Sequence, residues 1–285
     1  MGSSTFGFDG GAIRVGRLGF GAMHLPTEPA ADRSRSLAVA RRAVELGVTL
    51  VDTAHLYGGG ANEELLAEAL YPYPDDLLVT TKVGVARTGP GGEWRLDGRP
   101  EILRDQVDQA LRRLRVDRVE LLQLHRIDPE TPLAEQLGTL RELQAEGKVG
   151  RLGLSEVTVD ELAQAREIVD VVSVQNRYNL LDREHEPVLA ACEAAGIGFL
   201  PWRPVAAGTA GERAEIAAVA AETGGTPTQV ALAWLLAHSP VVLPIPGTAR
   251  IDHLEENLAA ANLHLTPSQL DRLSTLGAPS SPTDG

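Results

Sequence analysis

Hydrophobic residues occur along the chain in short runs rich in β-branched residues, and longer stretches of helical periodicity lie between these runs. Such runs are typical of buried strands, and the longer stretches are typical of amphipathic helices that cover a sheet. The pattern predicts eight strands, at residues 17–23, 48–54, 77–83, 119–126, 150–156, 171–178, 197–204 and 241–248.

Strand and helix alternate from one end of the pattern to the other. The clearest helical stretches are residues 36–47, 63–70, 101–115, 133–147, 184–196, 212–224 and 226–239. Several of them end in glycine, a usual helix stop. Alternation of this kind favours parallel strands joined by right-handed crossovers, in an open doubly wound sheet or a closed barrel. Eight units in about 250 residues favour a (β/α)8 TIM barrel, an α/β fold.

Three segments fall outside the repeat. Residues 6–15 predict a short N-terminal β-hairpin that turns at Asp9-Gly10-Gly11 and closes the bottom of the barrel. Residues 86–100 form a long glycine-rich stretch with an exposed Trp94, which we expect to be a loop and a lid over the site. Residues 277–285 are small and polar and predict a flexible tail. No shift in composition suggests a linker, so residues 1–285 are expected to form one domain.

The composition limits the classes of binding partner that we expect for the protein. A net charge of −13 and a pI near 5.0 disfavour nucleic acid or an anionic membrane as the main partner, because both require clustered cations. The single cysteine, Cys192, is expected to be a packing residue and fits a reducing compartment. No signal-like N-terminus or membrane-spanning stretch is present in the sequence, so we expect a cytoplasmic protein. A monomer is slightly preferred.

Polar side chains gather where the predicted strands end. In a barrel of this kind reactive groups collect at the C-terminal ends of the strands, because the strand interiors fill the core. Taken singly, each such residue is more often a helix cap, a packing residue or a solvated charge. Their convergence on one rim predicts an active site. The residues are Asp52, Lys82, His125, Ser155, Glu156, Gln175, Asn176, Trp202, Arg203, Gly247 and Thr248.

Tyr57 is the candidate proton donor. It lies about one turn beyond Asp52, and the glycines that follow it leave the backbone free to bend over the barrel mouth. A phenol has an ordinary pKa near 10, and a neighbouring cation such as Lys82 is expected to lower it. Asp52 would keep Lys82 charged and fixed in direction. His125 could donate a hydrogen bond to a substrate carbonyl oxygen.

These residues belong to segments that together closely resemble the aldo-keto reductases, in the right order over nearly the whole chain. The segments are residues 48–70, 77–83, 119–126, 149–156, 171–181 and 245–260. The resemblance places the catalytic tetrad of the family on Asp52, Tyr57, Lys82 and His125. It implies reversible reduction of an aldehyde or ketone by hydride from NADPH, with Tyr57 as the proton donor and NADH as an alternative cofactor.

The resemblance also implies where the cofactor binds. Ser155 and Gln175 match residues that hydrogen-bond the nicotinamide carboxamide, and Trp202 matches the aromatic residue on which the ring stacks. Residues 245–250 match a phosphate-binding turn before a helix. Glu256 and Asn257 match the acid and amide that hold the adenine. The family binds its cofactor without a Rossmann domain, which accounts for the incomplete glycine fingerprint near the N-terminus.

The chain departs from the pattern of the family at three places. Glu156 stands where the usual residue is Asn. Gly247 and His253 stand where some members have the Lys and Arg that bind the 2′-phosphate, which leaves Arg250, with Thr248, for this group. Because Arg suits bidentate phosphate recognition, NADPH is preferred. The loop after Trp202 is short and is not expected to clamp the cofactor.

Other functions remain open from the sequence. Members of the same family also serve as nicotinamide-binding regulatory subunits of ion channels, and the intact tetrad does not exclude that role. Lys82 could instead be the Schiff-base nucleophile of a barrel aldolase. A metal hydrolase could use Asp52, His55 and His125, although a cation beside Asp52 opposes a metal, and we expect none. The stretch 84–100 shapes the substrate pocket, so the sequence does not identify the substrate.

Overall fold

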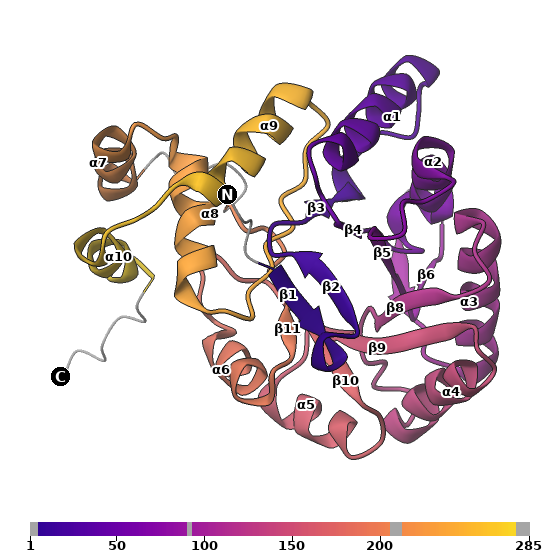
Figure 1. The fold of residues 1–285 in the computed structure, drawn as a ribbon. Helices are drawn as coiled ribbons and strands as arrows, with labels where there is room; N and C mark the ends of the chain where they lie inside the picture. Colours follow the sequence, from indigo (N-terminus) through magenta and orange to yellow (C-terminus); the bar gives the residue numbers. More distant parts are fainter. Residues whose placement is uncertain (1–4, 90–92, 206–212, 278–285) are drawn as a thin grey trace.

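The computed structural model of the chain describes residues 5–89, 93–205 and 213–277. Seven strands form one parallel sheet that curls into a ring, in the order β3-β4-β5-β8-β9-β10-β11 (Figure 1). The strands are β3 (Phe20–Gly21), β4 (Leu50–Asp52), β5 (Leu78–Val83), β8 (Val119–Leu124), β9 (Val149–Ser155), β10 (Val171–Gln175) and β11 (Gly198–Phe199). Each overlaps a predicted strand, with β9 beginning one residue before the prediction at Val149, and the sheet confirms the α/β-barrel class.

The eighth predicted strand, residues 241–248, is not a regular strand. It nevertheless lies between the two end strands of the sheet. The backbone of Phe199 exchanges two hydrogen bonds of 2.8 Å with this segment, and the N–H of Gly19 donates to the carbonyl of Pro244 at 2.9 Å. Pro244 and Pro246 have no N–H and cannot complete a β-ladder. The segment therefore joins the sheet edges through isolated backbone hydrogen bonds.

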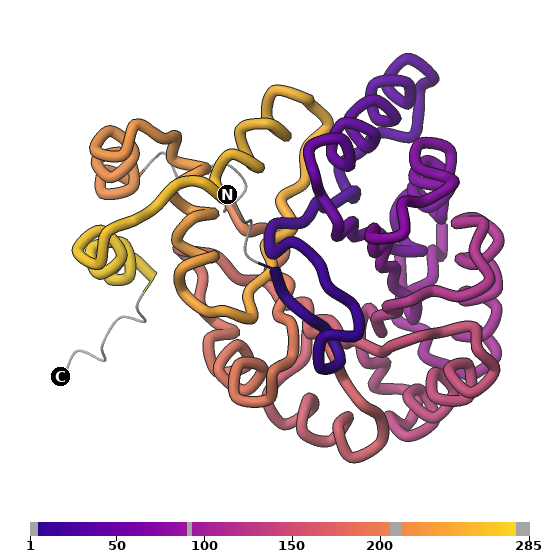
Figure 2. Tube along the Cα trace, in the orientation of Figure 1, coloured from indigo at the N-terminus to yellow at the C-terminus, as the bar shows by residue number. Residues whose placement is uncertain are grey.

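The predicted N-terminal hairpin is present. Strands β1 (Thr5–Phe8) and β2 (Ile13–Gly16) pair antiparallel around a short 3-10 helix, η1 (Asp9–Gly11). Figures 1 and 2 show the hairpin lying across one end of the ring. Its Phe8 and Val15 pack against apolar residues of the barrel interior, which include Leu50 at the start of β4. The hairpin therefore covers the end opposite the C-terminal ends of the strands.

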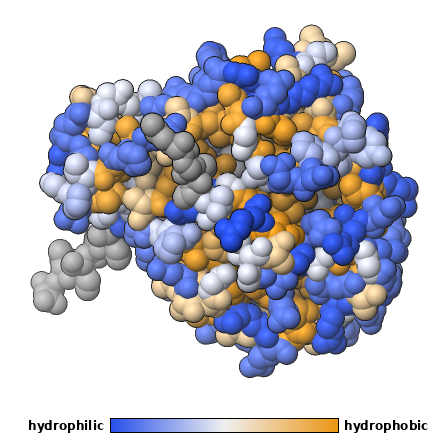
Figure 3. Space-filling model, in the orientation of Figure 1, coloured by the Kyte–Doolittle hydropathy of each residue, from blue (hydrophilic) through white to orange (hydrophobic). Residues whose placement is uncertain are grey.

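Helices surround the barrel. They are α1 (Ala30–Glu45), α2 (Ala61–Leu70), α3 (Pro100–Leu114), α4 (Leu133–Ala145), α5 (Val159–Arg166), α6 (Glu186–Ala195), α7 (Ala214–Thr223), α8 (Pro227–His238), α9 (Ile251–Ala259) and α10 (Pro267–Ser274). Helices α7 and α10 lie beside α8, outside the main ring (Figure 2). The outer helices give this face a largely hydrophilic rim around the apolar residues of its centre (Figure 3). Among the described residues, no helix combines the length and hydrophobicity needed to cross a membrane.

Of the segments outside the strand–helix repeat, one differs from its prediction and another lies outside the described residues. Part of the stretch 86–100, expected to be irregular, pairs as an antiparallel hairpin of β6 (Val85–Arg87) and β7 (Trp94–Leu96). Its Trp94 is exposed, as expected. Residues 90–92 of this stretch, most of the short loop after Trp202 and all of the expected tail beyond residue 277 lie outside the described residues.

Candidate active site

The four residues of the expected tetrad lie together at the C-terminal ends of neighbouring strands. Asp52 is the last residue of β4, Lys82 lies near the end of β5, and His125 directly follows β8. Tyr57 begins the short 3-10 helix η3 (Tyr57–Gly60) that follows β4. Because parallel strands end at one edge of the sheet, residues distant in sequence meet at a single mouth of the barrel.

Lys82 is the centre of this group. Its Nζ donates to Asp52 Oδ2 at 2.7 Å, to the carbonyl of Thr53 at 2.9 Å and to Tyr57 Oη at 3.2 Å. The side chain is fully buried, so its charge is tolerated only because these partners compensate it. Burial disfavours the charged form, but attraction to Asp52 and Tyr57 outweighs burial, and the pKa of Lys82 is raised. A charged ammonium is therefore directed at the phenol, and it is a poor nucleophile for an aldolase.

Asp52 is held from its other oxygen by two amides. Its Oδ1 accepts from Gln175 Nε2 at 2.8 Å and from Gln123 Nε2 at 3.4 Å. The side-chain amide of Gln175, a residue expected to bind the cofactor, therefore donates its hydrogen bond to Asp52. Gln123 was missed by the sequence reasoning. Its only signal was a polar residue inside the apolar strand β8, at a place where a strand interior is ordinarily hydrophobic.

Tyr57 is placed by a turn that only glycine permits. Gly58, Gly59 and Gly60 have φ values of 61°, 65° and 95°, in the left-handed region. A Cβ at Gly60 would lie 2.0 Å from an Arg113 guanidinium nitrogen, so the turn is also tightly packed. Three consecutive glycines therefore fold the chain back sharply and let Tyr57 reach Lys82.

The expected net lowering of the pKa of Tyr57 is wrong. Burial raises the pKa of this phenol, and the charge of Lys82 lowers it only in part. The effect of burial is the larger one because the phenolate loses more hydration free energy than it gains from attraction to the Lys82 ammonium. The phenol is therefore neutral at ordinary pH and carries its proton.

His125 lies across from Tyr57. The two rings meet edge-to-face with centroids 6.1 Å apart. Burial, Lys82 and Arg126 lower the pKa of His125 well below its ordinary value, so the imidazole is neutral. Its Nδ1 is buried without a hydrogen-bond partner among the described residues. An unpartnered buried nitrogen is unusual in a folded protein and is typical of a functional site.

Arg126 is a second residue that the sequence reasoning missed. It donates from one terminal nitrogen to the carbonyl of His125 at 2.6 Å and to Ser155 Oγ at 3.1 Å. Burial lowers the pKa of Arg126, while Glu156 and Tyr57 raise it. Ser155, expected at the carboxamide, is therefore bound to a guanidinium. The available signal was its place directly after the strand-end His125.

A hydrogen bond from the edge of the indole ring fixes Trp202. Its indole Nε1 donates to Glu156 Oε1, which also accepts from the backbone N–H of Arg177 at 2.7 Å. The guanidinium of Arg203 lies over the Trp202 ring, 5.7 Å from its centroid. Asn176 instead fixes the loop after β9. Its side-chain oxygen accepts from the N–H of Val157, and its side-chain nitrogen donates to the carbonyl of the same residue.

The segment expected to bind phosphates lies before α9. The N–H of Arg250 donates to Thr248 Oγ1 at 3.1 Å. The Arg250 side chain pairs with Asp252, with Nε 3.0 Å from Oδ1, and this pairing lowers the pKa of Asp252 to about 2. The pairing was not expected. A Cβ at Gly247 would lie 2.7 Å from the carbonyl oxygen of Gly21, so a larger residue does not fit.

Helix α9 carries the remaining expected cofactor residues. His253 is exposed and Asn257 is buried. Glu256 accepts from Thr226 Oγ1 at 2.7 Å, and its carbonyl accepts from Gln229 Nε2 at 3.0 Å. Glu256 is therefore tied to the first turn of α8.

The metal-site alternative finds little support in these contacts. His55 Nδ1 lies 3.1 Å from an Arg113 nitrogen, and burial with the Arg113 charge lowers the pKa of His55 to about 4. The carboxylate of Asp52 already forms an ion pair with the Lys82 ammonium. Within residues 5–89, 93–205 and 213–277, no group of three or more His, Cys, Asp or Glu side chains could hold a metal ion.

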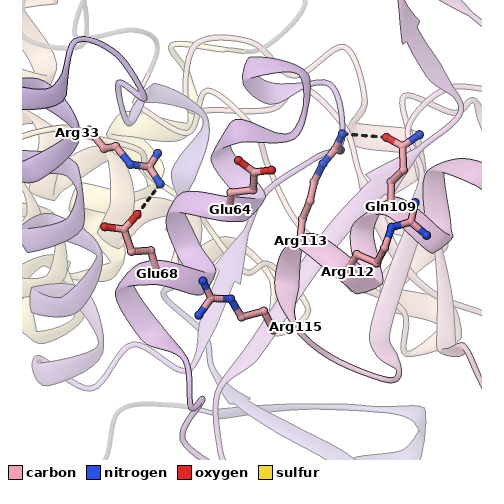
Figure 4. A pocket seen from close by; sticks show the side chains of 7 residues that line it. All are labelled: Arg33, Glu64, Glu68, Gln109, Arg112, Arg113 and Arg115. Carbon is pink, nitrogen blue, oxygen red and sulfur yellow. Dashed lines mark hydrogen bonds and ion pairs between the residues drawn. The ribbon is translucent and has the colours of Figure 1, made fainter.

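A polar hollow of about 580 Å³ lies elsewhere, between α1, α2 and α3. Figure 4 shows the Arg33–Glu68 ion pair on one side of it and the Arg113–Gln109 hydrogen bond on the other. The expected catalytic and cofactor residues do not line this hollow.

The fold and the site define an α/β-barrel enzyme with its polar residues at the C-terminal mouth. Residues 17–278 match the model of the aldo/keto reductase family, and the chain belongs to this family of oxidoreductases. It is 44% identical to an uncharacterized oxidoreductase of Schizosaccharomyces pombe, over 94% of this chain and 88% of the relative. It is 39% identical to the pyridoxine 4-dehydrogenase of Escherichia coli, over 96% and 98%. A Klebsiella pneumoniae aldo-keto reductase solved with NADPH has a TM-score of 0.85 at 28% identity, with 98% and 96% covered.

Proposed function

We propose that the protein reduces an aldehyde or ketone to an alcohol with NADPH, and that Tyr57 donates the proton. One observation carries the proposal: the buried Lys82 ammonium lies 2.7 Å from Asp52 and 3.2 Å from the Tyr57 hydroxyl. A cation in this place has no role in holding the phenol neutral. Its effect is to stabilise the phenolate that forms when the proton leaves.

Each residue of the site has a separate role in the proposed reaction. The neutral phenol of Tyr57 gives its proton to the carbonyl oxygen, and Lys82 stabilises the phenolate left behind. Asp52 holds Lys82 charged, while Gln175 and Gln123 hold Asp52. A neutral His125 has one ring N–H, which can orient the carbonyl oxygen. A bound nicotinamide cofactor would supply the hydride.

The mouth of the barrel fits a nicotinamide dinucleotide. The half-buried Trp202 offers a ring held at its edge. The buried Nδ1 of His125, at the same mouth, has no hydrogen-bond partner within the part of the chain that the structure describes. At the other end, the N-terminus of α9 suits an anion. We propose that the ring lies on Trp202, and that the residues around it are Ser155, Glu156, Gln175 and Arg203. We propose that the phosphates and adenosine contact Gly247, Thr248, Arg250, His253, Glu256 and Asn257.

The relatives suggest where to look for a substrate. Pyridoxine 4-dehydrogenase is 39% identical over almost the full length of both chains. Its name indicates an alcohol attached to a pyridine ring, and the corresponding carbonyl compound is the aldehyde pyridoxal. We therefore propose an aromatic aldehyde of the pyridoxal type as the first substrate to test.

The test is a turnover screen of pyridoxal, other aldehydes, ketones and sugars, with NADPH and NADH side by side. The expected result is oxidation of NADPH that depends on one class of carbonyl compound. Stable binding of NADPH without turnover on any member of a broad panel would contradict the proposal and favour a regulatory role.

A further inference from the structure

Glu156 places a fixed negative charge at the edge of Trp202. Its Oε1 accepts from the indole Nε1 and, at 2.7 Å, from the backbone N–H of Arg177. Both partners can only donate, which suits an ionised carboxylate. The side chain is 21% exposed, so solvent screens its charge only in part.

The backbone makes this residue unusual. Glu156 has a φ of 55°, in the left-handed region where Asn is enriched and other residues with a Cβ are disfavoured. Asn would fit the backbone better, but it would carry no charge. What glutamate adds at this place is the carboxylate.

We infer that the carboxylate of Glu156 makes the bound reduced nicotinamide a stronger hydride donor. The inference rests on the proposed function, in which the ring lies on Trp202. In the reduction, the carbonyl carbon gains a hydride, with its two electrons, and the carbonyl oxygen gains the proton of Tyr57. The ring changes from neutral to cationic. A negative charge beside it stabilises the cationic product, so Glu156 favours carbonyl reduction and tightens NADP+ relative to NADPH.

Two guanidinium groups and the imidazole of His185 also lie near this carboxylate. Arg126 interacts electrostatically with Glu156, His185 Nε2 lies 3.9 Å from its second oxygen, and Arg203 lies over the Trp202 ring. These groups weaken the field at the ring. They remain in place when Glu156 alone is changed, so a comparison of Glu156 with glutamine isolates one charge.

The experiment compares dissociation constants for NADPH, followed by its fluorescence, and for NADP+, followed by displacement of NADPH. It uses the wild type, Glu156→Gln and the control Glu184→Gln, whose side chain is 70% exposed. Glutamine keeps an oxygen that can accept from Trp202 and Arg177. We expect the ratio Kd(NADP+)/Kd(NADPH) to rise about three- to tenfold in Glu156→Gln. The ratio should not change in the control. No substrate is present, so the readout does not depend on turnover.

Two results would overturn the inference while leaving the proposed function standing. One is an unchanged ratio, and the other is an equal weakening of both nucleotides, which would make Glu156 only a positioning residue for Trp202. If Glu156→Gln does not fold, Glu156→Asn serves instead, because Asn tolerates the left-handed backbone. A wild-type protein that binds neither nucleotide would overturn both proposals.

Discussion

Lys82 combines charge, burial and direction in one residue. Its ammonium is enclosed by Asp52, Tyr57 and the carbonyl of Thr53, so it has little freedom to turn elsewhere. A cation with this little freedom is organised in advance for the charge that would form on the phenol in the proposed proton transfer. The pH dependence of turnover should therefore depend on Lys82.

We expect Lys82→Met to reduce kcat by about a hundredfold or more, in line with the contribution of general acid catalysis. Reduction requires a protonated Tyr57, so its rate falls as pH rises through the pKa of Tyr57. Lys82 lowers that pKa, and its loss should move the fall to higher pH. The check is kcat against pH, with the partly buried Lys148→Met, far from the barrel mouth in an ion pair with Asp108, as control. An unshifted profile would contradict the mechanism.

In the proposed cofactor site Arg250 binds the 2′-phosphate, and Asp252 is its ion-pair partner. Asp252 occupies the guanidinium and also repels a phosphate. We expect Arg250→Ala to weaken NADPH much more than NADH, and Asp252→Asn to tighten NADPH because it frees Arg250. Nucleotide titrations measure both effects. Equal losses for the two nucleotides in Arg250→Ala would remove Arg250 from the 2′-phosphate.

At the residue scale, the sequence predicted which side chains would meet, including the contacts of Lys82 with Asp52 and Tyr57, but it did not predict several other contacts of the site. Asp52, Tyr57, Lys82 and His125 lie at the ends of strands or just beyond them, and the topology brings strand ends together. The bond from Gln175 to Asp52 and the pairing of Arg250 with Asp252 depend on side-chain directions. No periodicity in the sequence reports those directions, so both contacts became visible only in three dimensions.

At the scale of elements, alternating hydrophobic patterns found the barrel strands but missed two short helices. Helices α5 and α10 have only eight residues each, a length that allows few repeats of a helical pattern. Both begin with a capping box, Thr158 with Glu161 and Thr266 with Gln269, which is the local signal that could have found them. The segment 241–248 shows the opposite case, because its apolar residues suggest a strand that its prolines prevent.

The turn that presents Tyr57 is an element whose shape requires glycine. We expect Gly60→Ala to lower turnover at least tenfold, because its Cβ would displace the Arg113 guanidinium and shift the turn. Gly147→Ala is the matched control. Gly147 also has a positive φ, of 80°, but open space surrounds it.

Both alanine variants should lose about 1 kcal/mol or more of unfolding free energy from backbone strain. Only Gly60→Ala should lose turnover. Steady-state kinetics and urea unfolding of the two variants distinguish the cases, and equal kinetics in both would contradict the role of the turn.

At the scale of the whole molecule, stability and chemistry lie at opposite ends of the barrel. The hairpin packs Phe8 and Val15 into one end, and the polar site occupies the other. Such a division allows the site to hold a buried ion pair while apolar packing stabilises the fold. A change at the hairpin should therefore affect unfolding more than catalysis.

We expect Phe8→Ala to reduce the free energy of unfolding by about 3–5 kcal/mol, because it removes a fully buried ring. The value of kcat in the folded fraction should change little. Urea unfolding and kinetics measured well below the unfolding midpoint give the two quantities. A large loss of kcat without loss of stability would contradict the separation of the two ends.

The most direct test of the central claim is a single-turnover measurement of NADPH oxidation by wild type and Tyr57→Phe, with the carbonyl substrate found in the screen. Phenylalanine keeps the ring beside His125 and removes only the hydroxyl bonded to Lys82. We expect normal NADPH binding and an oxidation rate lower by about a hundredfold or more. A variant that binds NADPH and oxidises it at nearly the wild-type rate would show that Tyr57 is not the proton donor.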